Sequence, residues 1–251
     1  MKPISIQLYT VREAAAKDFI GVLKKIAAIG YKGVEFAGLH GFKPAEIRKV
    51  LDDAGLVASS SHAGLPGPEN LQEMVDTAGT LGYKLIITGK GPDDFRTVDG
   101  IRKAAGQFQA GAAVLKGTGL SLGYHNHWWE FNLVDGRLGM EIFLELAPDV
   151  FSQTDVYWAC NFGAVDPAKF IRSHKKRIPI LHLKDGCFVR DHPHTAVGQG
   201  RVNFAKVVKA ADPKVLQWLI VELDACATDM MRAVEDSYKY LTEAGLAEGN
   251  K

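Results

Sequence analysis

The sequence predicts an α/β fold, a single (β/α)₈ TIM barrel that spans residues 1–251. Short apolar runs alternate with longer amphipathic segments along the whole chain, and eight of each can be counted. Strict alternation indicates parallel strands joined by helical crossovers. A closed barrel of this kind needs about 250 residues, which the chain supplies. No Gly-x-Gly-x-x-Gly motif follows the first run, so an open dinucleotide-binding sheet is disfavoured.

The elements in the first half of the chain have clear boundaries. A strand is expected at residues 4–9, followed by a helix over 17–29 whose apolar residues recur at helical spacing and which Gly30 ends. The same signals place strands at 33–37, 56–62 and 84–88, and helices at 44–54, 68–81 and 98–116. Proline near the start of a helix and glycine just past its end mark several of these limits.

The second half of the chain continues the pattern without a break. Strands are expected at 120–127, 150–155, 178–184 and 217–223, and helices at 140–146, 167–173, 204–211 and 230–244. No linker, low-complexity stretch or block of charge divides the chain, so one domain is expected.

The composition narrows the classes of function. The chain has 30 Lys and Arg against 29 Asp and Glu, a net charge of +1, and 47% hydrophobic residues, which is typical of a globular protein rather than a disordered or membrane-spanning one. Proteins that bind phosphate backbones usually have a strong basic excess, so nucleic acid is disfavoured as a partner. The three cysteines form no CxxC pair and the N-terminus lacks a signal-peptide core. We therefore expect a cytoplasmic protein with no membrane contact.

Polar residues gather at the C-terminal ends of the predicted strands. In the last two strands, apolar residues alternate with His182 and Lys184 and then with Glu222. Alternate residues of a barrel strand face the interior, and enzymes of this fold place their active sites at these strand ends. The full set at such positions is Glu35, His62, His125, His127, Asp155, His182, Lys184 and Glu222. Burying polar groups costs roughly 2–7 kcal/mol each unless they are paired or bound to metal, so these residues indicate a functional site.

Six stretches of the chain resemble a known family. They are IGYKGVEF (29–36), GYHNHWWEF (123–131), DVYWACNFGAVDP (155–167), ILHLKD (180–185), VGQGRVNF (197–204) and LIVELD (219–224). With these stretches the chain resembles the xylose isomerase-like TIM barrels, the superfamily of sugar phosphate isomerases and epimerases that also includes endonuclease IV-like enzymes. The YHNH segment is typical of one subgroup. Because members of this superfamily also catalyse dehydration, elimination and phosphodiester hydrolysis, the resemblance does not decide the reaction.

The resemblance implies one divalent metal ion, held by Glu, Asp, His and Glu from strands five to eight. Asp155, His182 and Glu222 match three of these positions. Strand five ends in His125 where related enzymes have a glutamate, and the nearest carboxylate is Glu130. We expect Glu130 to fold back as the fourth ligand, with His125 or His127 as the alternatives. A mixed carboxylate and imidazole set suits Mn²⁺, Mg²⁺, Co²⁺ or Zn²⁺.

The remaining candidates concern the substrate. Glu35 and His62 are expected to contact it, with support of a neighbouring site residue as the alternative for Glu35. Trp128 is expected to stack on a sugar ring, with packing within the fold as the alternative. Lys184 carries a positive charge that could stabilise an enolate. Arg201, which follows a Gly-Gln-Gly loop, is expected to bind the substrate, although this loop matches a phosphate-binding loop only weakly.

The expected function is metal-dependent isomerisation or epimerisation of a keto-sugar or sugar derivative through an enediolate. Related epimerases oppose two glutamates as acid and base, whereas this chain keeps Glu222 and has His125 and His127 at the other position. Imidazoles at that position favour, as the main alternative, a keto-glycoside lyase or hydratase or a sugar dehydratase. An endonuclease IV-like nuclease is a further alternative that the net charge disfavours. The expected partner is a small sugar, and the oligomeric state stays open, a homo-oligomer included.

Overall fold

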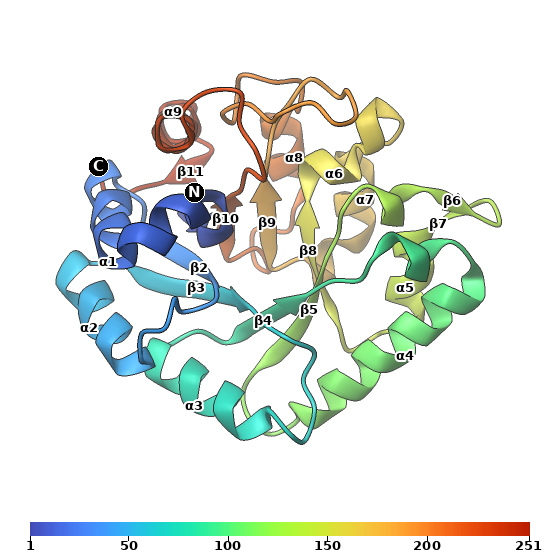
Figure 1. The fold of residues 1–251 in the computed structure, drawn as a ribbon. Helices are drawn as coiled ribbons and strands as arrows, with labels where there is room; N and C mark the ends of the chain where they lie inside the picture. Colours follow the sequence, from blue (N-terminus) through green and yellow to red (C-terminus); the bar gives the residue numbers. More distant parts are fainter.

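Eight parallel strands close into a barrel in the computed structural model, which describes residues 1–251 (Figure 1). The strands are β1 (Lys2–Gln7), β2 (Gly33–Ala37), β3 (Val57–His62), β4 (Leu85–Thr88), β5 (Ser121–His125), β8 (Phe151–Asp155), β9 (Ile180–Leu183) and β10 (Trp218–Val221). Strand β1 pairs with both β2 and β10, which closes the sheet. The predicted TIM barrel is confirmed.

Helices form a ring around the strands (Figure 1). They are α1 (Arg12–Ile29), α2 (Pro44–Ala54), α3 (Leu71–Leu81), α4 (Val98–Val114), α5 (Gly139–Leu146), α7 (Pro167–His174), α8 (Phe204–Ala210) and α9 (Met230–Glu243). A short strand, β11 (Ala247–Glu248), pairs with β1 outside the barrel. No helix combines the length and the apolar character needed to cross a membrane.

The first helix differs from its prediction. The structure begins α1 at Arg12, but the helix is broken at Asp18 (φ −152°, ψ 80°), whose carboxylate accepts the N–H of Gly21 at 2.8 Å. An aspartate in this position caps a helix start. The predicted start at residue 17 therefore corresponds to the second segment of α1.

Besides β11 and the short 3₁₀ turns, three small elements were not predicted. They are the hairpin of β6 (Leu133–Val134) and β7 (Arg137–Leu138) and the one-turn helix α6 (Val156–Ala159) that directly follows β8. Elements of two to four residues are too short to show a hydrophobic period. The hairpin and α6 both lie in connections that follow strands whose ends supply candidate site residues.

The interior of the barrel is apolar only at its N-terminal end. There, Leu85, Ile87, Ile180 and Ile220 pack together with Phe151 and Trp218. Gly123 makes room for this layer, because a Cβ at that position would lie 2.1 Å from the Phe151 ring. The layer forms a floor, and above it the side chains that face the interior are polar.

Candidate functional site

Glu35 lies at the centre of the polar layer and is fully buried. Its carboxylate accepts hydrogen bonds from Gln7 (2.6 Å), Ser60 (2.5 Å), Gln153 (2.6 Å) and His182 (2.6 Å). Burial alone would raise the pKa of Glu35, but the positive charge of His182 outweighs it and holds this pKa well below its usual value. The structure thus places Glu35 beneath the barrel mouth, as an anionic hub that orients its neighbours.

His182, on β9, lies between two carboxylates. Its Nε2 is 2.6 Å from Glu35 Oε1 and its Nδ1 is 2.9 Å from Glu222 Oε2. Burial would lower the pKa of His182, but the two carboxylates raise it to about 10. Both ring nitrogens therefore donate hydrogen bonds in this state, and the ring orientation is fixed.

Four candidate metal ligands converge above the polar layer. One ligand atom from each of His125, Asp155, His182 and Glu222 lies within 4.8 Å of the others, and all four residues are buried. They come from the ends of β5, β8, β9 and β10, where parallel strands of a barrel end together. We call this group the His-Asp-His-Glu cluster.

The donor atoms of the cluster fit a divalent ion. Asp155 Oδ1 accepts the N–H of Trp158 at 2.9 Å, whereas the buried Oδ2 makes no hydrogen bond, although it lies 3.0 Å from the Lys184 ammonium. The ion pair with Lys184 offsets the charge of this buried oxygen but leaves it without a hydrogen-bond donor, so it is free to coordinate a metal ion. The Glu35 carboxylate on His182 Nε2 is the kind of partner with which proteins fix metal-binding histidines.

Glu130 does not join the cluster, contrary to the expectation from the sequence. It is fully buried, and its carboxylate accepts hydrogen bonds from the Tyr124 hydroxyl at 2.7 Å and the His127 N–H at 2.9 Å. Burial raises its pKa to about 8. The ring of Tyr124 packs on Phe143 at 4.4 Å, toward α5, so Glu130 faces the helix layer. His125 takes the place in the cluster that Glu130 was expected to fill.

Lys184 is fully buried and contacts three carboxylates. Its Nζ lies 3.0 Å from Asp155 Oδ2, 3.0 Å from Glu222 Oε2 and 2.7 Å from Asp224 Oδ2. Burial would lower the pKa of the ammonium, but the three negative charges raise it well above its usual value. Lys184 therefore supplies a permanent positive charge beside the cluster.

Three histidines, His62, His125 and His127, lie near the mouth of the barrel. Burial lowers the pKa of His125 well below its usual value, and burial and Lys184 lower that of His127 to about 4. The buried Nδ1 of His127 has no hydrogen-bond partner, and its ring stacks on Trp129 at 4.2 Å. His62 remains partly exposed, with Nε2 2.8 Å from Gln153 Oε1. These positions suit side chains that meet a substrate.

Arg201 lies apart from the cluster, and the loop before it does not offer a phosphate site. The Asp185 carboxylate accepts hydrogen bonds from the backbone N–H groups of Gly186 (2.9 Å), Gly198 (3.0 Å), Gly200 (2.9 Å) and Val202 (3.1 Å). The donors that would hold a phosphate are thus already taken by the chain's own carboxylate. The exposed Arg201 guanidinium faces the ring of Phe188, 5.6 Å from its centroid.

Replacing Asp185 with alanine is expected to lower the free energy of unfolding by about 3 kcal/mol, because it leaves several N–H groups without a partner, each costing roughly 1–3 kcal/mol when buried. Urea unfolding of both proteins measures the change. Asp53→Ala is the control, since it removes only an exposed ion pair with Lys49, worth about 0–1 kcal/mol. Equal losses in the two variants would contradict this role for Asp185.

Two residues of the site were not singled out from the sequence. Gln153 bridges His62, His125 and Glu35. It precedes Asp155 by two residues on β8, so the alternation of the strand could have found it. His194 lines the mouth from the loop after β9, where no period applies.

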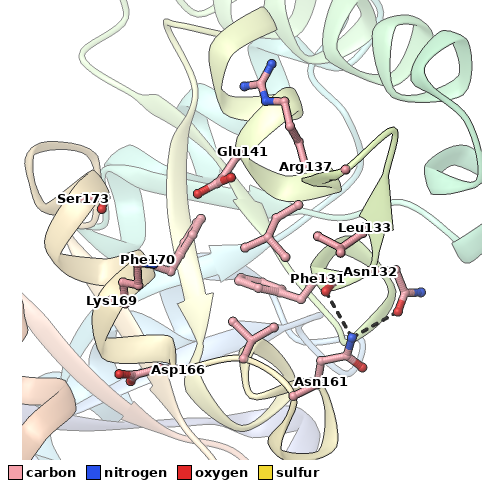
Figure 2. Close-up of a pocket in the computed structure, with 14 residues that line it drawn as sticks. Phe131, Asn132, Leu133, Arg137, Glu141, Asn161, Asp166, Lys169, Phe170 and Ser173 are labelled. Atoms are coloured by element: carbon pink, nitrogen blue, oxygen red, sulfur yellow. Dashed lines mark hydrogen bonds between the residues drawn. The ribbon is translucent and has the colours of Figure 1, made fainter.

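A separate hollow of about 510 Å³ lies between the β6–β7 hairpin and α7 (Figure 2). Asn161 closes one side, donating hydrogen bonds to Phe131 O at 3.1 Å and Asn132 Oδ1 at 3.0 Å. None of the candidate site residues lines this hollow. It is therefore not the active-site candidate.

Comparisons with known proteins agree with this architecture. A family model described as xylose isomerase-like TIM barrel matches residues 23–244. A sugar phosphate isomerase/epimerase from Parabacteroides distasonis is 25% identical, with a TM-score of 0.81 over 98% of this chain and 96% of that one. An L-ribulose 3-epimerase is 18% identical (TM-score 0.72, 98% and 95% covered). The IOLI protein, solved with a zinc atom, is 14% identical (TM-score 0.75, 98% of both chains). Among curated protein sequences, none matches this chain.

Proposed function

The chain belongs to the xylose isomerase-like TIM barrel family, and from that premise we propose that it is a metal-dependent enzyme that removes the proton next to the carbonyl of a keto-sugar or sugar derivative. The observation that carries the proposal is the convergence of the His-Asp-His-Glu cluster beside a buried cation. The likeness to a sugar phosphate isomerase/epimerase supports the sugar class. Isomerisation or epimerisation is the reaction that we favour.

His125, Asp155, His182 and Glu222 would hold the ion. Bound there, a divalent ion supplies Lewis acidity toward a sugar carbonyl and its neighbouring hydroxyl. The hydrogen bond from His182 Nε2 to Glu35 leaves Nδ1 as the nitrogen that faces the cluster. Mn²⁺, Mg²⁺, Co²⁺ and Zn²⁺ all accept this donor set.

The chain's own charged groups provide the remaining chemistry. Burial would raise the pKa of Glu222, but Lys184 and His182 outweigh it and hold this pKa well below its usual value. Glu222 is therefore ionised and can accept the proton from the carbon next to the carbonyl. The Lys184 ammonium, 3.0 Å from Glu222 Oε2, stabilises the negative charge that develops on the enolate oxygen.

Elimination from a keto-glycoside is a second candidate, favoured by the two imidazoles at the end of β5. His127 is neutral and has an unpaired Nδ1, so it can move a proton to or from a substrate oxygen without first breaking a hydrogen bond. When the carbon beside the enolate carries a leaving group, the enolate expels that group as the leaving oxygen takes up a proton. The same site would then act as a lyase or hydratase.

Replacing His125 with alanine is expected to weaken metal binding by roughly 10²-fold, and Glu130→Gln is expected to leave it unchanged. Metal affinities of about 10–16 kcal/mol shared by four ligands correspond to about 3 kcal/mol per ligand. His125 belongs to the cluster, whereas Glu130 is engaged with Tyr124. Calorimetric titration with Mn²⁺ and Zn²⁺ measures both variants. Loss of metal binding in Glu130→Gln, with retention in His125→Ala, would show that Glu130 and not His125 is the fourth ligand.

Incubating the metal-loaded protein in D₂O with keto-sugars and 3-keto-glycosides tests the reaction. Deuterium on the carbon next to the carbonyl is expected, and the product separates the reactions, since a new epimer or aldose indicates isomerase chemistry and a released alcohol indicates elimination. No deuterium in any substrate, together with cleavage of abasic DNA, would favour a nuclease. A two-metal nuclease needs a second set of ligands. The other group that could hold a metal here consists of His62, His125 and His182, and it shares His125 and His182 with the cluster. The nuclease is therefore disfavoured.

A further inference from the structure

We propose that the hollow beside the cluster is a second subsite, which binds an uncharged ring attached to the reacting sugar, so that the substrate is a two-ring glycoside. This inference rests on the proposed function. The hollow has a volume of about 260 Å³, and its walls include Trp128, Tyr157, Trp158, Phe162, His194 and Asp224. We call it the aromatic hollow.

The aromatic hollow borders the catalytic site, and the Asp224 side chain forms the wall between them. The Asp224 carboxylate lines the hollow and lies 2.7 Å from Lys184 Nζ, which in turn is 3.0 Å from Glu222 Oε2. The Lys184 ammonium also lies 5.0 Å from the centroid of the Trp158 ring, another wall of the hollow. A ligand that fills the hollow therefore lies within two side-chain contacts of the cluster.

The walls are arranged to meet the face of a ring. Phe162 lies between two tryptophans, with its ring centroid 5.7 Å from that of Trp128 and 6.2 Å from that of Trp158. Phe162 adopts a left-handed backbone (φ 55°, ψ 31°), which costs a bulky residue about 1–2 kcal/mol. Aromatic walls with a few placed polar groups are typical of small-molecule sites.

His194 gives the hollow a fixed hydrogen-bond donor. Its Nδ1 accepts the backbone N–H of Asp224 at 3.2 Å, so the proton of the neutral ring is on Nε2. The ring is held edge-on against Tyr157 at 5.1 Å and Trp158 at 5.2 Å, and its backbone pairs with Ala225 and Cys226. Nε2 has no partner within the protein, so it can donate to a ligand oxygen.

The charges around the hollow favour an uncharged ligand. Beside the His194 ring, whose Nδ1 lies 3.9 Å from Asp224 Oδ2, the Asp224 carboxylate accepts hydrogen bonds, and its charge is balanced by Lys184 at 2.7 Å. The backbone N–H groups of the Gly-Gln-Gly loop are bound to Asp185. Arg190 and Asp191 also line the hollow with opposite charges, and the Arg190 guanidinium stacks on Trp128, 3.9 Å from the ring centroid. The balanced charges, the His194 donor, the Asp224 acceptor and the aromatic walls together match the hydroxyls and the C–H face of a sugar ring.

Calorimetry on the metal-loaded full chain tests the subsite. The ligands are D-fructose, D-fructose 6-phosphate and four glucosyl-fructoses of different linkage (turanose, maltulose, leucrose and isomaltulose). At least one glucosyl-fructose is expected to bind 10-fold or more tightly than fructose. The inference is overturned if none of the four does so, or if fructose 6-phosphate shows the larger gain.

Three variants test which residues cause the tighter binding of the two-ring ligands. Trp128→Ala removes a wall, and His194→Asn removes the Nε2 donor while its amide oxygen can still accept from Asp224 N–H. Both are expected to abolish the two-ring advantage, measured as the ratio of the glucosyl-fructose affinity to the fructose affinity of the same variant. Trp218→Phe is the matched control, because Trp218 packs in the floor of the barrel and does not line the hollow. An advantage that persists in both test variants overturns the subsite.

Deuterium exchange on fructose separates this inference from the proposed function. Exchange without a two-ring advantage leaves the enzyme function standing and removes the subsite. A two-ring advantage that depends on His194, without exchange in any ketose, keeps the binding site and removes the proposed reaction.

Discussion

Replacing Lys184 with methionine is expected to lower turnover by about 10²–10³-fold, the usual effect of removing one group that stabilises charge in the transition state. Methionine keeps the length of the side chain and removes the charge that lies within 3.0 Å of both Asp155 and Glu222. Metal affinity is expected not to fall, because the variant removes a like charge from the neighbourhood of the ion. Turnover of the most active ketose and calorimetric metal titration measure the two effects separately.

Lys206→Met is the control for Lys184→Met. Lys206 forms an ion pair with Asp166 at 2.7 Å, but its side chain is half-exposed, so turnover should not change. Lys184→Met leaves three carboxylates without their shared cation, and breaking such a buried pair costs roughly 3–5 kcal/mol; bound metal should recover part of this loss. A folded Lys184→Met protein with unchanged turnover would show that the lysine is structural only.

Replacing Asp155 with asparagine is expected to weaken metal binding by roughly 10²-fold, on the same share of about 3 kcal/mol per ligand, and to lower activity with it at limiting metal. The substitution preserves shape and removes the charge on the buried Oδ2, which makes no hydrogen bond. Equilibrium dialysis against Mn²⁺ or Zn²⁺, followed by metal analysis, gives the change.

Asp224→Asn is the matched control for metal retention. Like Asp155→Asn, it removes a negative charge beside the Lys184 ammonium, which lies 2.7 Å from Asp224 and 3.0 Å from Asp155. Asp224, however, does not belong to the cluster. Equal loss of metal in both variants would mean that the charge around Lys184, and not a ligand at Asp155, controls binding. Undiminished metal in Asp155→Asn would remove Asp155 from the ligand set.

The fold could be predicted from the sequence because its elements repeat, and the convergence of Asp155, His182 and Glu222 follows from their places at the ends of parallel strands. The fourth member could not be predicted. Whether Glu130 folds back depends on its hydrogen bonds to Tyr124 and His127, which only the folded loop creates. Gln153 could have been predicted, because it lies two residues before Asp155 on β8 and so shares its face of the strand. His194 could not, because a pairing between two loops places it.

The Asp185 carboxylate holds the two ends of the connection between β9 and α8 together and leaves the tip of this loop exposed. Its four hydrogen bonds tie Gly186 to the segment 198–202, while residues 189–193 between them are exposed. Such a tip can change in sequence or length at little cost to folding, because loop closure depends only weakly on length. The tip carries Arg190 and borders the aromatic hollow. We therefore expect substitutions in this tip to change ligand preference while the barrel and its catalytic groups stay unchanged.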